Sequence, residues 1–328
     1  MARSMAQTVG ELGEIALVDR IIAATRGAKG PRKGVVVVGP GDDAAVLAAP
    51  DGRVVVTTDV LVESRHFRRD WSSAEDIGVK AVAENLADIA AMGARPTGLV
   101  IGLALPPETE VAWVDGFLAG VLAEAGRVGA ALAGGDVVRA DAIYVSVTAM
   151  GDLEDREPVL RSGARAGDVI AVSGRLGCAA AGLAVLSRGF RSPRALVDAH
   201  RRPEPDYAAG IRAAESGAHA LMDVSDGLLL DAGRLAKASG VSIDLDSAAI
   251  PVDEVLASTA AAYNLDPLTW VLGGGDDHAL LAAFAKGAKL PEGFTAIGKA
   301  AKCGPDGPAV SVDGRAPEFM PGFEHFRN

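Results

Sequence analysis

Short runs of β-branched residues alternate with longer segments of helical periodicity along the whole chain. The predicted strands span residues 35–38, 53–58, 99–105, 143–149, 169–173, 221–224 and 294–297. The predicted helices span residues 11–26, 77–92, 110–127, 179–187, 206–215, 225–237 and 252–263. Alternation of this kind favours helices layered on sheets, so we expect an α/β (α+β) fold.

The length of the chain indicates two domains rather than one. With 328 residues, it exceeds the size at which a single hydrophobic core usually stops growing. Apolar residues make up 49% of the chain, which is enough for two cores. The segment from Asp152 to Gly167 is polar and rich in turn-forming residues. We therefore expect an N-terminal domain at 1–152 and a C-terminal domain at 153–328.

Charge and cysteine content exclude several classes of protein. The net charge is −11, whereas a nucleic-acid-binding surface needs positive charge, so we expect no nucleic-acid partner. The two cysteines, Cys178 and Cys303, fit neither a disulfide framework nor a zinc site. No apolar run reaches the roughly 18 residues that span a bilayer, and the first nine residues lack a signal core. These features predict a cytoplasmic protein without a membrane partner.

Aspartates recur at glycine turns and at the predicted ends of strands. They are Asp42, Asp43, Asp59, Asp136, Asp223, Asp226, Asp276 and Asp277. Any one of them is readily explained as a turn residue, because aspartate bonds to nearby backbone. The joint pattern is more informative, since Asp59 and Asp223 each follow directly on an apolar strand. We expect such positions to present functional groups.

A convergent group of carboxylates requires cations. Two carboxylates about 4 Å apart repel by roughly 4 kcal/mol at an effective dielectric constant near 20. Oxygen ligands without a cluster of cysteine or histidine favour Mg²⁺ or Mn²⁺ over zinc. Because Mg²⁺ commonly bridges carboxylates and phosphates, the pattern predicts a phosphate substrate.

Other features leave two readings open when the residues are taken alone. Lys80, Glu84 and Asp88 share a helix face, which favours a solvated charged stripe. The turn at 174–177 opens a helix whose N-terminus could receive a phosphate, although an ordinary strand-to-helix turn explains it equally well. Ser225 is a plausible N-cap of the following helix. His66 either faces the same site as Asp59 or lies on the surface. Neither a P-loop nor a G-x-G-x-x-G motif occurs, which disfavours the common nucleotide folds.

The ordered set of motifs resembles the thiamine-monophosphate kinase family over nearly the whole chain. The matching stretches are Gly41–Ala45, Thr57–Asp59, Glu63–Phe67, Asn85–Ala94, Gly134–Asp136, Arg161–Ala164, Met222–Gly227, Gly274–Asp277 and Gly322–Phe326. The resemblance implies a two-domain PurM-like fold, shared with aminoimidazole ribonucleotide synthetase, and a homodimer formed through the N-terminal domains. It also implies transfer of the ATP γ-phosphoryl group to thiamine monophosphate, giving thiamine diphosphate.

The resemblance further implies a role for individual residues. Magnesium ligands would be Asp43, Thr57, Thr58, Asp59, Asp88, Asp136, Asp223 and Asp226. ATP would contact Gly135, Asp136, Arg161 and Ser225, and thiamine monophosphate would contact His66, Asp276 and Phe323. Asp88 thereby moves from a surface stripe to a metal ligand, whereas Asp42 and Asp277 receive no role. The chain departs from the family pattern at Ala87, Val137 and Asp276, where serine, threonine and glutamate are usual.

Two rival functions follow from the same pattern. One is another ATP-using enzyme of the superfamily, such as a selenophosphate synthetase or a hydrogenase maturation factor. The first expects a reactive cysteine or selenocysteine near the N-terminus and the second a C-terminal cysteine, and this sequence has neither. The other rival is a non-enzymatic nucleotide- or thiamine-binding module, which would not need so many acids of the metal-binding type.

Overall fold

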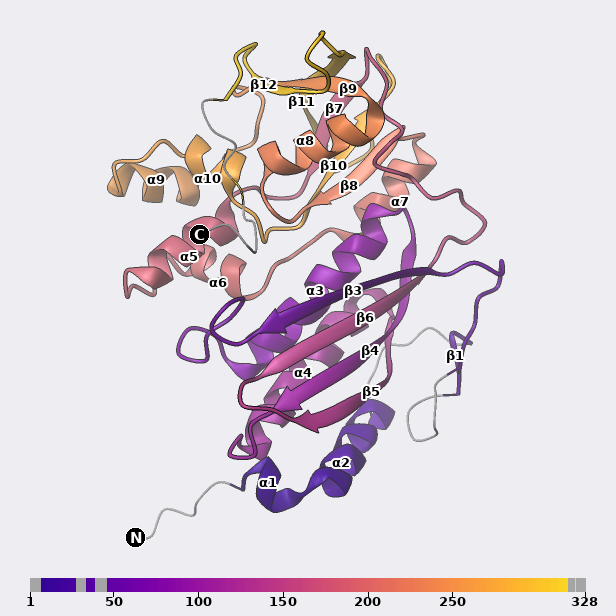
Figure 1. The fold of residues 1–328 in the computed structure, drawn as a ribbon, viewed down its shortest axis with the longest axis vertical. Helices are drawn as coiled ribbons and strands as arrows, with labels where there is room; N and C mark the ends of the chain where they lie inside the picture. The colour runs from indigo at the N-terminus through magenta and orange to yellow at the C-terminus, as the bar shows by residue number, and fades with distance from the viewer. Residues whose placement is uncertain (1–6, 28–33, 39–45, 318–321, 323–328) are drawn as a thin grey trace. The chain divides into compact units, whose positions relative to one another are not determined.

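The computed structural model describes residues 7–27, 34–38, 46–317 and 322. The chain forms two compact units (Figure 1). The first comprises Met1–Ile89 and Arg95–Glu154, and the second comprises Ala90–Ala94 and Asp155–Asn328. Both are built from helices and sheets, so the predicted fold class is confirmed.

The first unit is organised around a four-stranded mixed sheet. Its strands, in spatial order, are β3 (Val55–Val62), β6 (Tyr144–Asp152), β4 (Arg95–Leu105) and β5 (Ala131–Arg139). Only β4 and β5 run parallel within it. The remaining elements are the helices α1 (Val9–Leu12) and α2 (Glu14–Gly27) and the paired strands β1 (Val36–Val38) and β2 (Val46–Leu47).

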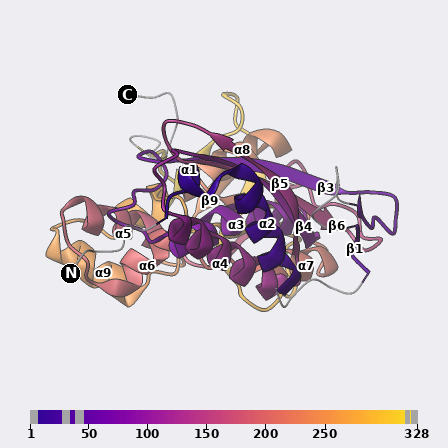
Figure 2. The same ribbon diagram turned by 90° about the horizontal axis from the view of Figure 1, so that it is seen from below.

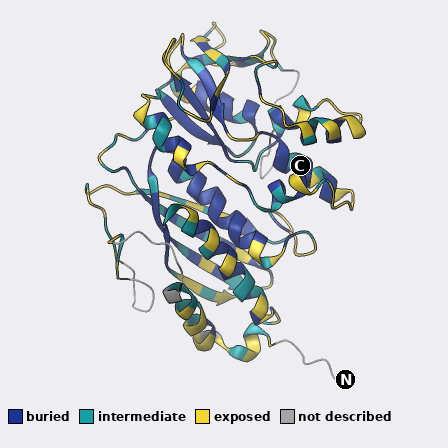
Figure 3. Ribbon diagram, turned by 180° about the vertical axis from the view of Figure 1, so that it is seen from behind, coloured by how far each residue is buried: buried dark blue, intermediate teal, exposed yellow. Residues whose placement is uncertain are grey.

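Two long helices, α3 (Ala74–Ala91) and α4 (Val111–Val128), lie on one face of this sheet (Figures 1 and 2). Their backbones pass close together at glycines. A Cβ atom at Gly120 would lie 2.1 Å from the carbonyl oxygen of Glu75, and one at Gly78 would lie 2.1 Å from that of Phe117. Helix α3 is buried along almost its whole length (Figure 3). The glycines therefore fix how closely α3 and α4 approach.

The opposite face of the sheet is apolar and exposed. Strand residues alternate between the two faces, and Val56, Val60, Val138 and Tyr144 on the open face are 43–61% exposed. Val145 and Val147, which point to the other face from Tyr144 along the same strand, are buried on the helix side. A protein surface rarely leaves a contiguous apolar area of this kind uncovered without a functional reason.

The second unit contains a six-stranded sheet and six helices within its described residues. The strand order is β12 (Val310–Val312), β9 (Val241–Leu245), β11 (Phe294–Lys302), β7 (Val169–Ser173), β10 (Ala279–Phe284) and β8 (Ala220–Val224). The helices are α5 (Cys178–Ser187), α6 (Arg194–Arg201), α7 (Tyr207–Glu215), α8 (Leu228–Ser239), α9 (Glu254–Ala262) and α10 (Leu268–Gly273). One continuous apolar core joins the sheet to α5 and α8. Among the described residues, no helix is both long and apolar enough to cross a membrane.

The structure corrects the predicted position of the key aspartates. Asp59 lies inside β3 rather than after it, and Asp136 lies inside β5 rather than in a turn. Asp223 lies inside β8, within the strand predicted at 221–224. The predicted helix at 11–26 breaks at Gly13, whose φ is 82°. Ser225 is not an N-cap, because α8 starts three residues later and is capped at Gly227.

Replacing Gly120 by alanine tests the close approach of α3 and α4. The added methyl group would overlap the backbone of Glu75, and such overpacking typically costs about 1–3 kcal/mol. Gly116→Ala is the matched control on the same helix, since its methyl carbon would come no closer than 3.2 Å to an atom of another element, the nearest being the Ala74 Cβ. Denaturant unfolding should show a clear loss for Gly120→Ala and little change for Gly116→Ala. Equal stability of the two variants would contradict the packing account.

Candidate functional site

In the first unit, side chains from β3 and α3 form a hydrogen-bonded group of oxygen atoms. The hydroxyl of Thr57 donates to Oδ2 of Asp88 at 2.6 Å. The backbone N–H of Asp59 donates to Oδ1 of Asn85 at 3.0 Å, and the Asn85 amide donates in turn to the Ala81 carbonyl oxygen at 2.9 Å. Three of the predicted metal ligands, Thr57, Asp59 and Asp88, are thus brought together.

The local sequence explains this arrangement. Thr57 and Asp59 are two residues apart on a strand, so both side chains point to the helix-covered face. Asn85 and Asp88 are three residues apart on α3 and share one side of the helix. Asn85 is a residue whose role the sequence reasoning missed. Its signal is the spacing Asn-x-x-Asp, which places two polar side chains on one side of the helix.

The charged residues of α3 are not a solvated stripe. Lys80 is 3% exposed and Glu84 9%, and Lys80 Nζ lies 3.7 Å from Oε1 of Glu84. Lys80 also lies 3.5 Å from the carbonyl oxygen of His66. Charged groups are buried at this level when they are paired. The structure therefore contradicts the surface reading of this helix face.

Two other predicted residues lie close by in sequence but differ in orientation. Thr58 alternates to the opposite face of the sheet, where its hydroxyl donates to the Val147 carbonyl at 2.9 Å. His66 lies in the loop after β3, and its Nδ1 accepts the Val62 N–H at 2.9 Å. This bond fixes the ring and leaves Nε2 as the nitrogen that carries the proton in the neutral form.

Gly135 and Asp136 lie at the other edge of the same sheet. Strands β6 and β4 separate them from β3, a distance of about 14 Å at the usual strand spacing. Both residues line a cavity of about 970 Å³ whose walls are mainly apolar and include Ile21, Phe117 and Leu118. Cavities of roughly 300–1,000 Å³ are typical of small-molecule sites. Within one chain, Asp136 is not part of the Thr57–Asp88 group.

In the second unit, the turn after β8 and the loop before β10 form another acidic group. Nδ1 of His278 lies 3.2 Å from Oδ2 of Asp223, and both residues are buried. The Asp276 N–H donates to the Ser225 carbonyl at 2.9 Å. A Cβ atom at Gly275 would lie 2.0 Å from that same Ser225 oxygen, so the close approach requires glycine.

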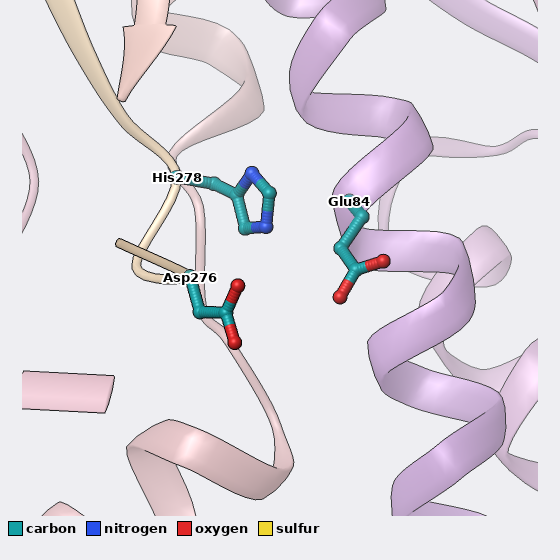
Figure 4. A group of neighbouring side chains, drawn as sticks. All are labelled: Glu84, Asp276 and His278. Atoms are coloured by element: carbon teal, nitrogen blue, oxygen red, sulfur yellow. The ribbon is translucent and has the colours of Figure 1, made fainter. Parts of the chain in front are cut away.

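Asp276 and His278 project from this loop as neighbours (Figure 4). A carboxylate oxygen of Asp276 lies within 4.8 Å of a ring nitrogen of His278. Both residues have positive φ, 67° and 53°, which is uncommon outside glycine and marks a constrained loop. The view also draws Glu84, which belongs to α3 of the first unit. Sequence reasoning missed His278, whose only signal is its place directly after the two aspartates.

The turn that carries Asp226 is anchored by two residues of α8. Oδ2 of Asp231 accepts the N–H groups of Asp226 and Gly227 at 3.0 and 3.1 Å. Arg234 contacts both Asp226 and Asp231. Burial raises the pKa of Asp231 to about 6, because its charged form is poorly solvated. Both anchoring residues were absent from the sequence-based set.

Asp277, which received no role from the sequence, is a structural residue at the start of α5. Its Oδ1 accepts the Ala179 N–H at 3.0 Å, while its Oδ2 is buried without a hydrogen-bond partner. Burial raises the pKa of Asp277 to about 7. Because this carboxylate occupies the N-terminus of α5, the turn at 174–177 is explained as an ordinary strand-to-helix turn rather than a phosphate site.

The remaining predicted residues are placed only in part. Asp43 and Phe323 lie outside the described residues. Gly322, next to Phe323, packs against the Asp226 turn, since a Cβ atom there would lie 3.1 Å from the Asp226 carbonyl oxygen. Arg161 is exposed, and its carbonyl accepts the Ser239 hydroxyl at 2.8 Å.

Comparison with known proteins agrees with this architecture in both halves of the chain. Residues 41–153 match the AIR synthase related protein N-terminal domain, and residues 165–286 match the corresponding C-terminal domain. The thiamine-monophosphate kinase of Mycobacterium tuberculosis is 48% identical over 321 residues, covering 97% of this chain and 93% of that protein.

Solved structures show the same relationship. The crystal structure of thiamine-monophosphate kinase from Stenotrophomonas maltophilia has a TM-score of 0.80 and 35% identity, and the match covers 92% of this chain and 96% of that one. A structure described as AaThiL complexed with AMPPCP and TMP has a TM-score of 0.78 and 33% identity, with 98% and 100% covered.

The two domain matches define an AIR synthase-related protein with the PurM-like fold, as the motif order predicted. Full-length identity to the kinases then narrows the assignment. The chain belongs to the thiamine-monophosphate kinase family. The prediction of a kinase of this class, EC 2.7.4.16, is thereby confirmed.

Replacing Asp277 by asparagine should remove a pH dependence of stability. The folded protein binds this proton more tightly than the unfolded chain does, since the pKa rises from 3.8 to about 7. Its contribution is therefore full below about pH 4 and is lost as the pH rises through about 7, by at most about 1.4 kcal/mol per pH unit. Asparagine keeps an acceptor for the Ala179 N–H and does not titrate.

Urea unfolding from pH 4 to pH 8 provides the measurement. The difference in midpoint between Asp277→Asn and the wild type should shift steadily in favour of the variant as the pH rises. Asp198→Asn, at an exposed position on α6, is the control. Parallel pH profiles for Asp277→Asn and the wild type would show that Asp277 is not a buried titrating acid.

Proposed function

We propose that this chain transfers the γ-phosphoryl group of ATP to thiamine monophosphate, giving thiamine diphosphate and ADP, the last step of thiamine diphosphate biosynthesis. The observation that carries the proposal is the Thr57–Asp88 hydrogen bond, which joins a hydroxyl of β3 to a carboxylate of α3. The description of AaThiL as complexed with AMPPCP and TMP supports the choice of both substrates.

The donor set of the first unit fits magnesium. Thr57, Asp59 and Asp88 offer hydroxyl and carboxylate oxygens, and Asn85 holds the Asp59 backbone without adding charge. Oxygen donors of this kind are the ligands that Mg²⁺ prefers. Bound magnesium would supply positive charge to phosphate oxygens. Asp223 and Asp226 are the proposed ligands from the second unit, and Asp43, Thr58 and Asp136 remain predictions as ligands.

The chemistry requires little proton transfer from the protein. The acceptor is a phosphate oxygen of thiamine monophosphate, which is largely ionised near neutral pH. It forms a bond to the γ-phosphorus as the bond to the β,γ-bridging oxygen breaks, and ADP leaves. Such a reaction depends on positioning and charge neutralisation rather than on a general base. We accordingly assign no catalytic base among the described residues.

Two of the proposed substrate contacts, Asp276 and His66, belong to segments that hydrogen bonds hold in place. The loop that carries Asp276 is fixed by its bond to Ser225, and the His66 ring is fixed by Val62. Phe323 would stack on thiamine with a cation–π contribution from the thiazolium ring. Gly135, Asp136, Arg161 and Ser225 are the proposed ATP contacts, and the cavity beside Gly135 has the size of a small-molecule site.

Replacing Asp59 by alanine tests both the activity and the metal group. With ATP, Mg²⁺ and thiamine monophosphate, the wild type should form thiamine diphosphate, detected as its fluorescent oxidation product. The variant should lose more than about 100-fold in rate, beyond the 10–100-fold typical of residues outside the ligand shell. Asp70→Ala, which removes an exposed acid of the same unit, should keep normal turnover. Absence of thiamine diphosphate with the wild type would refute the function, and an active Asp59→Ala would refute the metal group.

The exposed apolar face of the first unit's sheet supports a homodimer. Tyr144 on that face is 43% exposed, and Phe190 of the second unit, at 58%, is a matched exposed aromatic residue. We expect Tyr144→Asp to shift the protein towards monomer in sedimentation velocity at micromolar concentration, and Phe190→Asp to leave the dimer intact. A wild-type monomer under these conditions would contradict the proposal.

A further inference from the structure

The turn between β8 and α8 is held from inside the helix rather than by its cap. The N-cap, Gly227, has φ of 124° and no side chain with which to bond the first N–H groups of the helix. Asp231, in the first turn of the helix, instead reaches back to the turn, where its Oδ2 accepts the N–H groups of Asp226 and Gly227. Asp231 is 0% exposed. Removing its carboxylate would therefore leave the N–H groups that it accepts without a hydrogen-bond partner.

One turn further along α8, Arg234 joins the same network through a single nitrogen. Its NH1 lies 2.6 Å from Oδ1 of Asp231 and 2.5 Å from Oδ2 of Asp226. The Asp231 carboxylate therefore accepts three hydrogen bonds, one from the Arg234 cation and two from backbone N–H groups. Arg234 itself is 40% exposed at its side chain, so it can be replaced without opening the core.

Asp226 is held at two points, its backbone and its carboxylate. Its backbone N–H is bound by Asp231 and its Oδ2 by Arg234, so the carboxylate has a fixed position and direction. A carboxylate carries two oxygens, and the contact with Arg234 is made by Oδ2 alone. Carboxylates that bind metals are commonly oriented in this manner by hydrogen bonds to one oxygen.

We propose that Asp231 and Arg234 are positioning residues that hold the Asp226 carboxylate for a divalent cation. The inference rests on the proposed function only in taking Asp226 as a metal ligand. Asp226 lies in the turn before α8 and Asp231 in the first turn of the helix. Arg234 contacts both carboxylates and therefore also offsets the repulsion between them. Without Arg234, the Asp226 carboxylate would lose its fixed direction.

The test measures metal binding separately from turnover. Mn²⁺ binding to the full chain is followed by electron paramagnetic resonance, and the class of sites lost in Asp226→Ala defines the Asp226 site. In Arg234→Ala the affinity of this class should fall about 10–100-fold, the range typical of outer-shell partners. The rate at saturating Mg²⁺ should change far less than the Mg²⁺ concentration that gives half the maximal rate.

Conservative and distant variants complete the design. Arg234→Lys should recover part of the affinity, because it restores the charge but not the planar geometry. Asp231→Asn should weaken the same class, since it keeps an acceptor and loses the ion pair with Arg234. Arg194→Ala, which removes an exposed arginine paired with Asp198 on α6, should leave Mn²⁺ binding unchanged. Adding Arg234→Ala to Asp226→Ala should cause no further loss.

The outcomes separate this inference from the proposed function. Unchanged or tighter Mn²⁺ binding in Arg234→Ala would overturn it, and tighter binding would mean that Arg234 competes with the metal. Failure of Asp226→Ala to remove any class of sites would also overturn it. A wild type that binds Mn²⁺ and loses affinity in Arg234→Ala, yet forms no thiamine diphosphate, would support the positioning role and refute the kinase proposal alone.

Discussion

Carboxylates held close together repel each other, and the rest of the site follows from how this chain manages that repulsion. Three of the candidate acids have a partner that is neutral or cationic: the Thr57 hydroxyl for Asp88, His278 for Asp223 and Arg234 for Asp226. At an effective dielectric constant near 20, an unrelieved pair about 4 Å apart would cost roughly 4 kcal/mol. The partners reduce this cost in the folded protein and fix the direction of each carboxylate.

The same constraint shapes the chemistry. A site of fixed, oriented acids is suited to binding divalent cations and, through them, phosphate groups. It is poorly suited to covalent catalysis by a nucleophile, and burial raises the pKa of the Cys178 thiol, which keeps that group neutral. An acceptor that is already an ionised phosphate oxygen needs neither a nucleophile nor a general base from the protein. Fixed acids that bind cations, together with an ionised acceptor, therefore suffice for the proposed reaction without a general base from the protein.

The sequence predicted much of this fold because the elements are strongly patterned. The strand at 169–173 is predicted to the residue, and α4 differs from its prediction by one residue at each end. Local pattern could not place Asp59 and Asp136 inside strands, because an acid next to glycine or after a run of strand residues reads as a turn. Tertiary pairing overrides that preference: Asp59 lies opposite Val147 and Asp136 opposite Gly102. Strands β9 and β10 escaped prediction for a related reason, since short apolar runs do not distinguish strand from helix.

The sequence predicted the acids of the candidate site but not the residues that form hydrogen bonds or ion pairs with them. Motif order predicted a functional role for Asp88, whereas its helical spacing by itself favoured a surface stripe, and in the structure Asp88 accepts the Thr57 hydroxyl. Asn85, Asp231, Arg234 and His278 could not be assigned, because each acts through a contact that only the folded chain creates. The Asp231–Arg234 spacing of three residues is common on any helix, and nothing in it indicates that the pair reaches back to Asp226.

The central claim is that the phosphoryl group passes directly between the two substrates. The stereochemical course at the γ-phosphorus tests it, using ATP made chiral at that position with oxygen isotopes and sulfur. A single in-line transfer predicts inversion of configuration in the thiamine diphosphate product. Retention would require an intermediate bound to the protein and would contradict the account.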